Sequence, residues 1–181
     1  MRLIAYLTAV TLGILTLASC SNKKSLQQYL VDKQEDERYI KLDIAASLLQ
    51  SDSADYTLEQ EEILKTIKKV NVVAYPVKGD NAGDYPGEKA ELKDILNQDR
   101  YKTLMKMGSN TSGMTLQYMG EEDAIDEVIV FASDDEKGFA VFRLLGEDMQ
   151  LDQMMKLMTS IDKGDVDVGQ LSGIGDLFSN L

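Results

Sequence analysis

Four apolar runs separated by short polar turns occupy residues 101–145, and they constrain the fold more than any other feature of the chain. Residues 101–107 lead through GSNTSG into 114–119, and residues 125–132 lead through SDDEKG into 139–145. A polar, glycine-containing turn between two apolar runs is typical of an antiparallel hairpin. The sequence therefore predicts a meander of four strands in the second half of the chain.

A strand and a helix are expected well before this meander. Ile40, Leu42 and Ile44 alternate with polar residues, which predicts a half-buried strand. Thr57 is followed three residues later by Gln60, the spacing of a capping box, so a helix is expected to begin there.

A second strand, a second helix and a final helix complete the pattern. Residues 70–77 are β-branched and end near Pro76, which predicts a strand, and residues 88–98 carry a helical apolar stripe. The last helix has one apolar face and Asp148 as its expected cap, the face being formed by Leu151, Met154, Met155 and Met158. The order β-α-β-α-β-β-β-β-α predicts an α+β fold, with a mainly antiparallel sheet and helices packed on one face.

The chain is expected to divide into four segments around one domain. These are a lipoprotein signal peptide over residues 1–19, a lipid anchor with a tether or short helix over 20–36, a single α+β domain over 37–163, and a glycine-containing tail over 164–181.

The N-terminus has the layout of a secretory signal. Arg2 precedes an apolar stretch that is too short for a stable membrane span, and the stretch closes with Leu17, Ala18 and Ser19 before Cys20. This motif resembles the lipobox of bacterial lipoproteins, and the resemblance implies that Cys20 becomes the lipidated N-terminal residue. The alternative is an ordinary signal followed by a structural thiol, although a single cysteine excludes a disulfide within the chain.

The residues after Cys20 indicate where in the cell envelope the protein is located. Surface-exported lipoproteins of Bacteroidetes typically carry acidic residues there, whereas this chain carries Lys23 and Lys24. We therefore expect lipid anchoring in the outer membrane with the domain facing the periplasm, the cell surface being the alternative.

Composition excludes several functions. Arg2 is the one charged residue in segment 1–19. Removal of this segment therefore leaves 18 Lys and Arg against 31 Asp and Glu, a net charge of about −13. Such a domain repels nucleic acid, so no nucleic-acid partner is expected. Histidine is absent, which excludes Ser-His-Asp and Cys-His catalysis and histidine-ligated metals.

Two kinds of acidic motif are candidate sites. The clusters Glu121–Asp123 and Asp134–Glu136 fall in predicted turns, where carboxylates are solvated and unsuited to paired acid–base catalysis. The segments Asp80–Asp84 and Asp165–Gly169 each resemble part of a calcium loop but lack its full set of ligands, so turns are favoured. No catalytic residue, metal or cofactor is expected.

Apart from Met1, all methionines lie between residues 105 and 158. Thioethers bind Cu(I), and a hairpin would bring together Met105, Met107, Met114 and Met119. Methionine also fills irregular cores and adaptable binding grooves, and that interpretation is favoured.

The C-terminal tail carries the clearest interaction motif. Helical spacing would place four apolar side chains together, namely Leu171, Ile174, Leu177 and Phe178. Such a helix would dock either onto its own domain or into a groove of a partner protein.

The chain as a whole resembles the Bacteroidetes DUF4252 lipoprotein family, a domain of unknown function. The resemblance rests on Leu17–Cys20, YIKLDIAASLL, KKVNVVAYPV and the segment IDEVIVFASDDEKGFAVFRLLGEDMQLDQMMKLM, and it covers nearly all of residues 20–163. It implies a periplasm-facing or surface lipoprotein and supplies no catalytic residue.

These observations together predict a non-enzymatic, lipid-anchored binding or structural module of the cell envelope. Its partners would be the membrane, through lipid on Cys20, and an envelope protein. The alternative is a periplasmic lipoprotein that binds a small ligand or a metal, as a sensor does.

Overall fold

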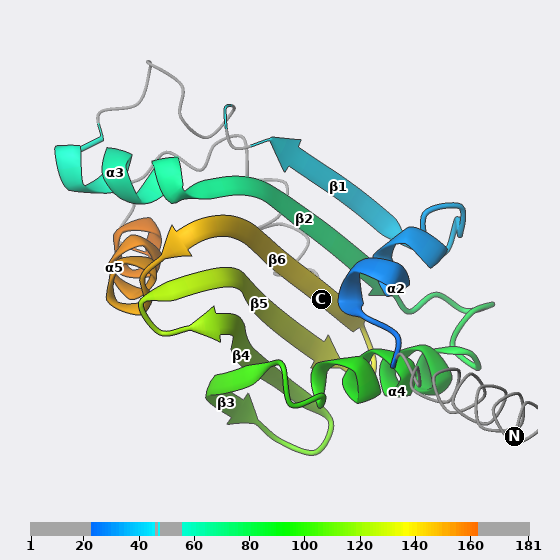
Figure 1. Ribbon diagram of the computed structural model, residues 1–181. Helices are drawn as coiled ribbons and strands as arrows, with labels where there is room; N and C mark the ends of the chain where they lie inside the picture. The colour runs from blue at the N-terminus through cyan, green and yellow to red at the C-terminus, as the bar shows by residue number, and fades with distance from the viewer. Residues whose placement is uncertain (1–22, 46, 48–55, 163–181) are drawn as a thin grey trace, which may run out of the picture.

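The computed structural model describes residues 23–45, 47 and 56–162. Its elements, in chain order, are α2 (Leu26–Asp32), β1 (Ile40–Ala45), α3 (Leu58–Thr66), β2 (Ile67–Pro76), α4 (Tyr85–Leu96), β3 (Lys102–Gly108), β4 (Ser112–Glu121), β5 (Ala124–Asp134), β6 (Gly138–Met149) and α5 (Leu151–Asp162). Strand and helix order therefore follow the predicted α+β pattern, and α2 takes the short-helix alternative for the segment after the anchor (Figure 1).

The six strands form one sheet in which every neighbouring pair is antiparallel. The strand order is β1-β2-β6-β5-β4-β3, so β6 returns from the meander to lie beside β2. The predicted α+β class with an antiparallel sheet is confirmed, whereas the helices pack on both faces of the sheet and not on one as predicted. Strands β4, β5 and β6 are longer than their apolar runs, because polar residues at the turns extend the pairing, as at Ser112 with Asp134.

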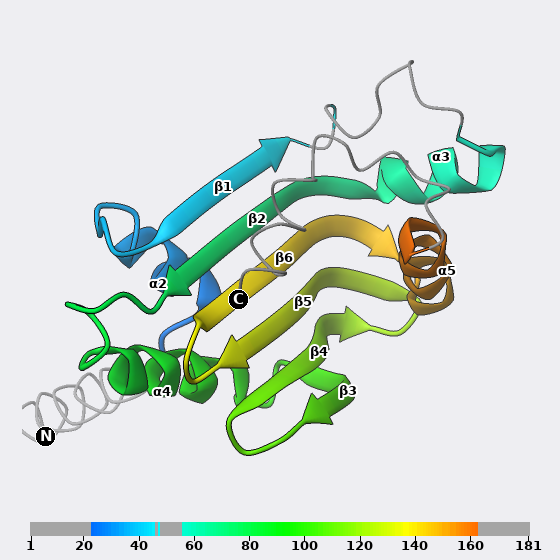
Figure 2. The same cartoon turned by 180° about the vertical axis from the view of Figure 1, so that it is seen from behind.

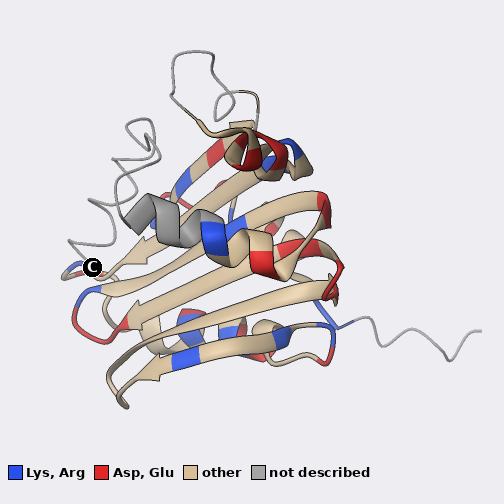
Figure 3. Cartoon of the chain, turned by 90° about the vertical axis from the view of Figure 1, so that its left-hand side faces the viewer, with Lys and Arg blue, Asp and Glu red and all other residues tan. Residues whose placement is uncertain are grey.

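The two faces of the sheet carry separate cores. Helices α2 and α4 cover one face, and its core is built on aromatic rings such as Tyr75 and Phe139, which stack with centroids 5.5 Å apart. Helices α3 and α5 pack at one end of the opposite face, where Ile63 and Met154 contact strand residues (Figure 2). We call these the covered face and the open face. Charged residues gather on the helices and at the strand ends, and the middle parts of the central strands are largely uncharged (Figure 3).

Helix α2 is part of the folded domain. Ser25 and Gln28 form a capping box at its start, and Leu26 and Tyr29 are fully buried. Helix α3 also begins with the predicted capping box of Thr57 and Gln60. Leu58 of α3 is 80% exposed, because α3 lies at the end of the sheet and contacts it through its C-terminal half, at Ile63 and Leu64.

Two local predictions were wrong. Helix α4 begins at Tyr85, three residues before the expected start, because Pro86 fits the first turn of a helix, where no backbone N–H is needed. Asp148 does not cap α5, because it lies within β6 in a left-handed conformation (φ 53°) and the helix begins at Leu151.

Candidate functional site

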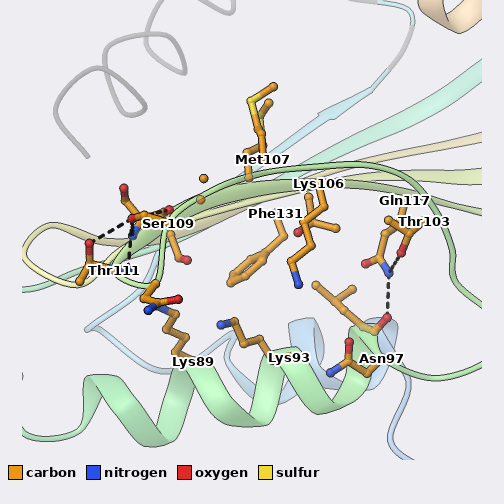
Figure 4. Close-up of a pocket in the computed structure, with 18 residues that line it drawn as sticks. Lys89, Lys93, Asn97, Thr103, Lys106, Met107, Ser109, Thr111, Gln117 and Phe131 are labelled. Carbon is orange, nitrogen blue, oxygen red and sulfur yellow. Dashed lines mark hydrogen bonds between the residues drawn. The ribbon is translucent and has the colours of Figure 1, made fainter.

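A pocket of about 360 Å³ opens on the covered face between α4 and the β3–β4 hairpin (Figure 4). Its floor is formed by side chains of β4 and β5, including Thr115, Gln117, Phe131 and Ser133. Register explains this set, because Thr115 pairs with Phe131 and alternate residues of each strand share a face. The volume lies at the lower end of the range typical of small-molecule sites.

Three lysines line this pocket from two directions. Lys89 and Lys93 lie one helical turn apart on α4, and Lys106 reaches toward them from β3 (Figure 4). Lys106 pairs with Thr115, which places it on the covered face. We refer to this site as the lysine pocket.

The charge of the lysine pocket is only partly neutralised. Lys89 Nζ lies 2.6 Å from Asp135 Oδ1 in the β5–β6 turn. Within the part of the chain that the structure describes, Lys93 and Lys106 form no ion pair. Partial burial, together with repulsion from Lys89 and Lys106, lowers the pKa of Lys93, and Asp135 opposes this shift. A bound anion would relieve the repulsion between these amines.

The hairpin turn closes one end of the pocket. Gly108 has φ +125°, and a Cβ atom there would lie 2.3 Å from Gly113 Cα, so the turn requires glycine. Ser109 and Thr111 brace the turn, since the Ser109 hydroxyl accepts hydrogen bonds from the backbone N–H groups of Thr111 and Ser112. The turn therefore presents a fixed polar wall to the pocket.

A buried amide closes the other end. Gln117 Nε2 donates to the carbonyl of Leu96 at 3.0 Å and to Thr103 Oγ1 at 3.2 Å (Figure 4). These bonds join the end of α4 to the pocket floor and to β3. They therefore fix the distance between the helix that carries Lys89 and Lys93 and the strand that carries Lys106.

The two acidic clusters from the sequence lie in turns at opposite ends of β5. Glu121 pairs with Lys102 at 3.1 Å, and Asp135 pairs with Lys89. Asp134 Oδ1 accepts hydrogen bonds from the backbone N–H groups of Glu136 and Lys137 and so shapes its own turn. The structure does not bring these carboxylates together in a cleft.

The first of the two calcium-like segments is a structural turn. Asn81 accepts a hydrogen bond from the Lys78 N–H and donates to the Pro76 carbonyl, while Asp84 pairs with Arg38 at 2.8 Å. The second segment, Asp165–Gly169, lies outside the described residues. Among the residues that are described, no three acidic or cysteine side chains gather as a metal site would require.

The methionines are divided between the two faces of the sheet. Met107 pairs with Met114 across the hairpin and Met105 pairs with Leu116 on the open face, whereas Met119 packs against the covered face. Met149 and Met154 are buried in the core behind α5.

The residues predicted for lipidation and docking lie outside the described part of the chain. They are Leu17, Ala18, Ser19 and Cys20 at the N-terminus, and Leu171, Ile174, Leu177 and Phe178 in the tail. No helix among the described residues is long and apolar enough to cross a membrane.

The lysine pocket was missed at the sequence level, although part of its signal is visible there. Lys89 and Lys93 have the i, i+4 spacing of one helix face, and Lys106 alternates with the apolar Met105 and Met107. Nothing in the sequence joins the two segments, because the contact depends on α4 lying over β3 and β4.

The fold and the site together define an α+β protein with one antiparallel sheet, a helical cover and a cationic pocket beneath that cover. The sequence model of the family described as "Domain of unknown function (DUF4252)" matches residues 29–157, and the chain belongs to this family. The match extends from within α2 into α5, so it covers the whole sheet and the lysine pocket. Searches of curated proteins and of solved structures found no match to the chain.

Proposed function

We propose that the protein is a non-enzymatic, lipid-anchored binding module of the cell envelope, and that it binds a small anion in the lysine pocket. The observation that carries this proposal is the convergence of Lys89, Lys93 and Lys106 on one pocket in a chain whose net charge is −12. Like charges repel at short range, so such a cluster is costly without an anionic ligand.

The chemistry of the pocket favours a ligand with phosphate or carboxylate groups. Lysine amines donate charge-assisted hydrogen bonds to both groups, and the hydroxyls of Thr103, Thr115 and Ser133 add neutral donors. Phe131 supplies an apolar surface at the floor, which suits an organic anion (Figure 4). The small-ligand form of the envelope module is therefore preferred to a purely structural role.

Several features support a non-enzymatic role at the envelope. The chain has no histidine, and the carboxylates of its acidic clusters pair with lysines or shape turns. The lipobox-like Leu17–Cys20 motif and Lys23 and Lys24 support anchoring in the outer membrane with the domain facing the periplasm.

The test is calorimetric titration at low ionic strength with inorganic phosphate and, separately, with citrate. Replacing Lys93 by Gln removes a charge-assisted hydrogen bond, typically about 1.5–3 kcal/mol, so the affinity should fall about 10-fold or more. Raising the salt concentration should weaken binding of either anion.

The matched control is Lys65→Gln, which removes an exposed lysine from helix α3 at the other end of the sheet. It should leave the affinity unchanged. If neither anion binds, or if Lys93→Gln and Lys65→Gln bind equally well, the proposal fails.

A further inference from the structure

The open face carries two continuous apolar rows that cross all six strands. The register aligns Leu42, Val72, Phe142, Val130, Leu116 and Met105 in the first row, and Ile40, Ala74, Ala140, Ala132, Met114 and Met107 in the second. Neither row contains a polar residue. The same strands place Asp43, Asn71, Arg143 and Lys106 on the covered face, so the apolar rows are a property of one face alone.

Helices α3 and α5 pack into a core that reaches the first row, at Val72 and Leu116, and includes no residue of the second row. They pack over the strand ends near Ile44 and Val70, and no other helix in the described part of the chain lies on this face (Figure 2). Ile40 and Leu42 are 41% and 38% exposed, and Met107 at the far edge is 51% exposed. The centres of both rows are buried, because Val72, Leu116, Ala74 and Ala140 are at most 2% exposed. Burial of Ala74 and Ala140, with no described helix over them, indicates that the second row is covered.

The second row leaves room for a helix. Its centre consists of Ala74, Ala140 and Ala132 on three adjacent strands, and larger side chains stand at the edges. Three strands spaced about 4.8 Å apart give a low floor about 10 Å across, which matches the diameter of an α-helix.

We propose that the occupant of these rows is the chain's own C-terminal segment, residues 171–178. Helix α5 ends at Asp162 at the border of the open face, and Met154 of α5 belongs to the same core cluster as Val72 and Leu116. The chain continues from there for 19 residues, 163–181.

The length of this segment is sufficient. The eight residues 163–170 reach about 27 Å when extended. Four residues separate Val70 from Ala74 along β2, which is about 13 Å. Gly164 and Gly169 allow the chain to turn back from α5.

The apolar pattern of the segment fits the face. On a helix, Leu171, Ile174, Leu177 and Phe178 share one side. Asp176 falls on the opposite side, directed away from a sheet that offers it no partner. Gly173 and Gly175 disfavour a free-standing helix, so helix formation there requires contact with the rows.

A disulfide trap tests this proposal in the full chain carrying Cys20→Ala, which removes its single native thiol. Leu42→Cys combined with Phe178→Cys should form a disulfide within one chain under mild oxidation. The control combines Phe178→Cys with Ala45→Cys, because Ala45 is an exposed residue of the same strand on the covered face; this pair should stay reduced.

Truncation after Lys163 gives an independent measurement. The melting temperature should fall by about 3 °C or more, and the amides of β1 should exchange faster with deuterium, because the rows lose their cover. Ser179→Asp, a change off the apolar side, should leave both unchanged.

Disulfides between two chains would assign the rows to a second copy and overturn the proposal. Equal oxidation of the two cysteine pairs, or an unchanged melting temperature after truncation, would overturn it as well.

Discussion

At the scale of single residues, the most consequential interaction of the sheet is a buried ion pair beneath α2. Arg143 Nε donates to Glu127 Oε1 at 2.8 Å, and Nη2 donates to Oε2 at 3.0 Å. The two residues are 5% and 2% exposed, and Gln27 of α2 accepts from the remaining nitrogen, Nη1. This bidentate geometry satisfies both groups, so the cost of burying the charges depends on keeping the pair intact.

Arg143→Met should therefore destabilise the fold by about 3–5 kcal/mol, because Glu127 would remain buried without its partner. The double variant Arg143→Met, Glu127→Leu should recover most of that loss, since no charge remains to be desolvated. Urea denaturation measures both variants. Lys102→Gln is the control, because it breaks an exposed pair with Glu121 and should cost less than about 1 kcal/mol. A double variant as unstable as the single one would contradict this account.

At the scale of elements, α2 is held to α4 by a chain of hydroxyl and carboxylate contacts. Tyr39 donates to Glu88 Oε2 at 2.6 Å, and its hydroxyl lies 2.8 Å from that of Tyr29. Lys33 and Arg38 pair with the same carboxylate. Burial, together with the bond to Glu88, raises the pKa of Tyr39 far above its ordinary value, so the phenol remains a donor.

Tyr39→Phe should cost about 1–3 kcal/mol, because the Tyr29 hydroxyl and Glu88 each lose a buried hydrogen-bond partner. Faster deuterium exchange in α2 should accompany the loss, while the meander keeps its protection. Tyr118→Phe is a matched control, since Tyr118 is buried and the structure records no hydrogen bond from its hydroxyl to another described residue. Equal losses for the two variants would remove the special role of this network.

Most elements could be predicted from the sequence, because each depends on a local pattern. The capping box at Thr57 and the polar turns between apolar runs each determine structure within a few residues. Sheet order could not be predicted in this way, since the pairing of β2 with β6 joins residues about 70 positions apart. The lysine pocket and the exposure of Ile40 and Leu42 follow from that strand order. The alternation of apolar and polar residues along a single strand therefore could not predict either feature.

At the scale of the whole molecule, the fold determines how an anchored domain would sit. Lys24 pairs with Glu91 of α4 at 2.6 Å, and its carbonyl accepts a hydrogen bond from Gln98, so a residue only four positions after Cys20 is fixed to α4. Four residues span at most about 14 Å. A lipid on Cys20 would therefore hold α4, and the lysine pocket beside it, close to the membrane surface.

This arrangement depends on Cys20 being acylated. Several acyl chains give durable attachment, since each buried methylene contributes about 0.8 kcal/mol. Cys20→Ala protein should move from the membrane to the soluble fraction and should not incorporate radioactive palmitate, whereas Ser21→Ala should be labelled and retained like the native chain. Unchanged labelling or continued retention of Cys20→Ala would show that the domain is held by something other than this lipid. The lysine pocket would then have no fixed position relative to the bilayer.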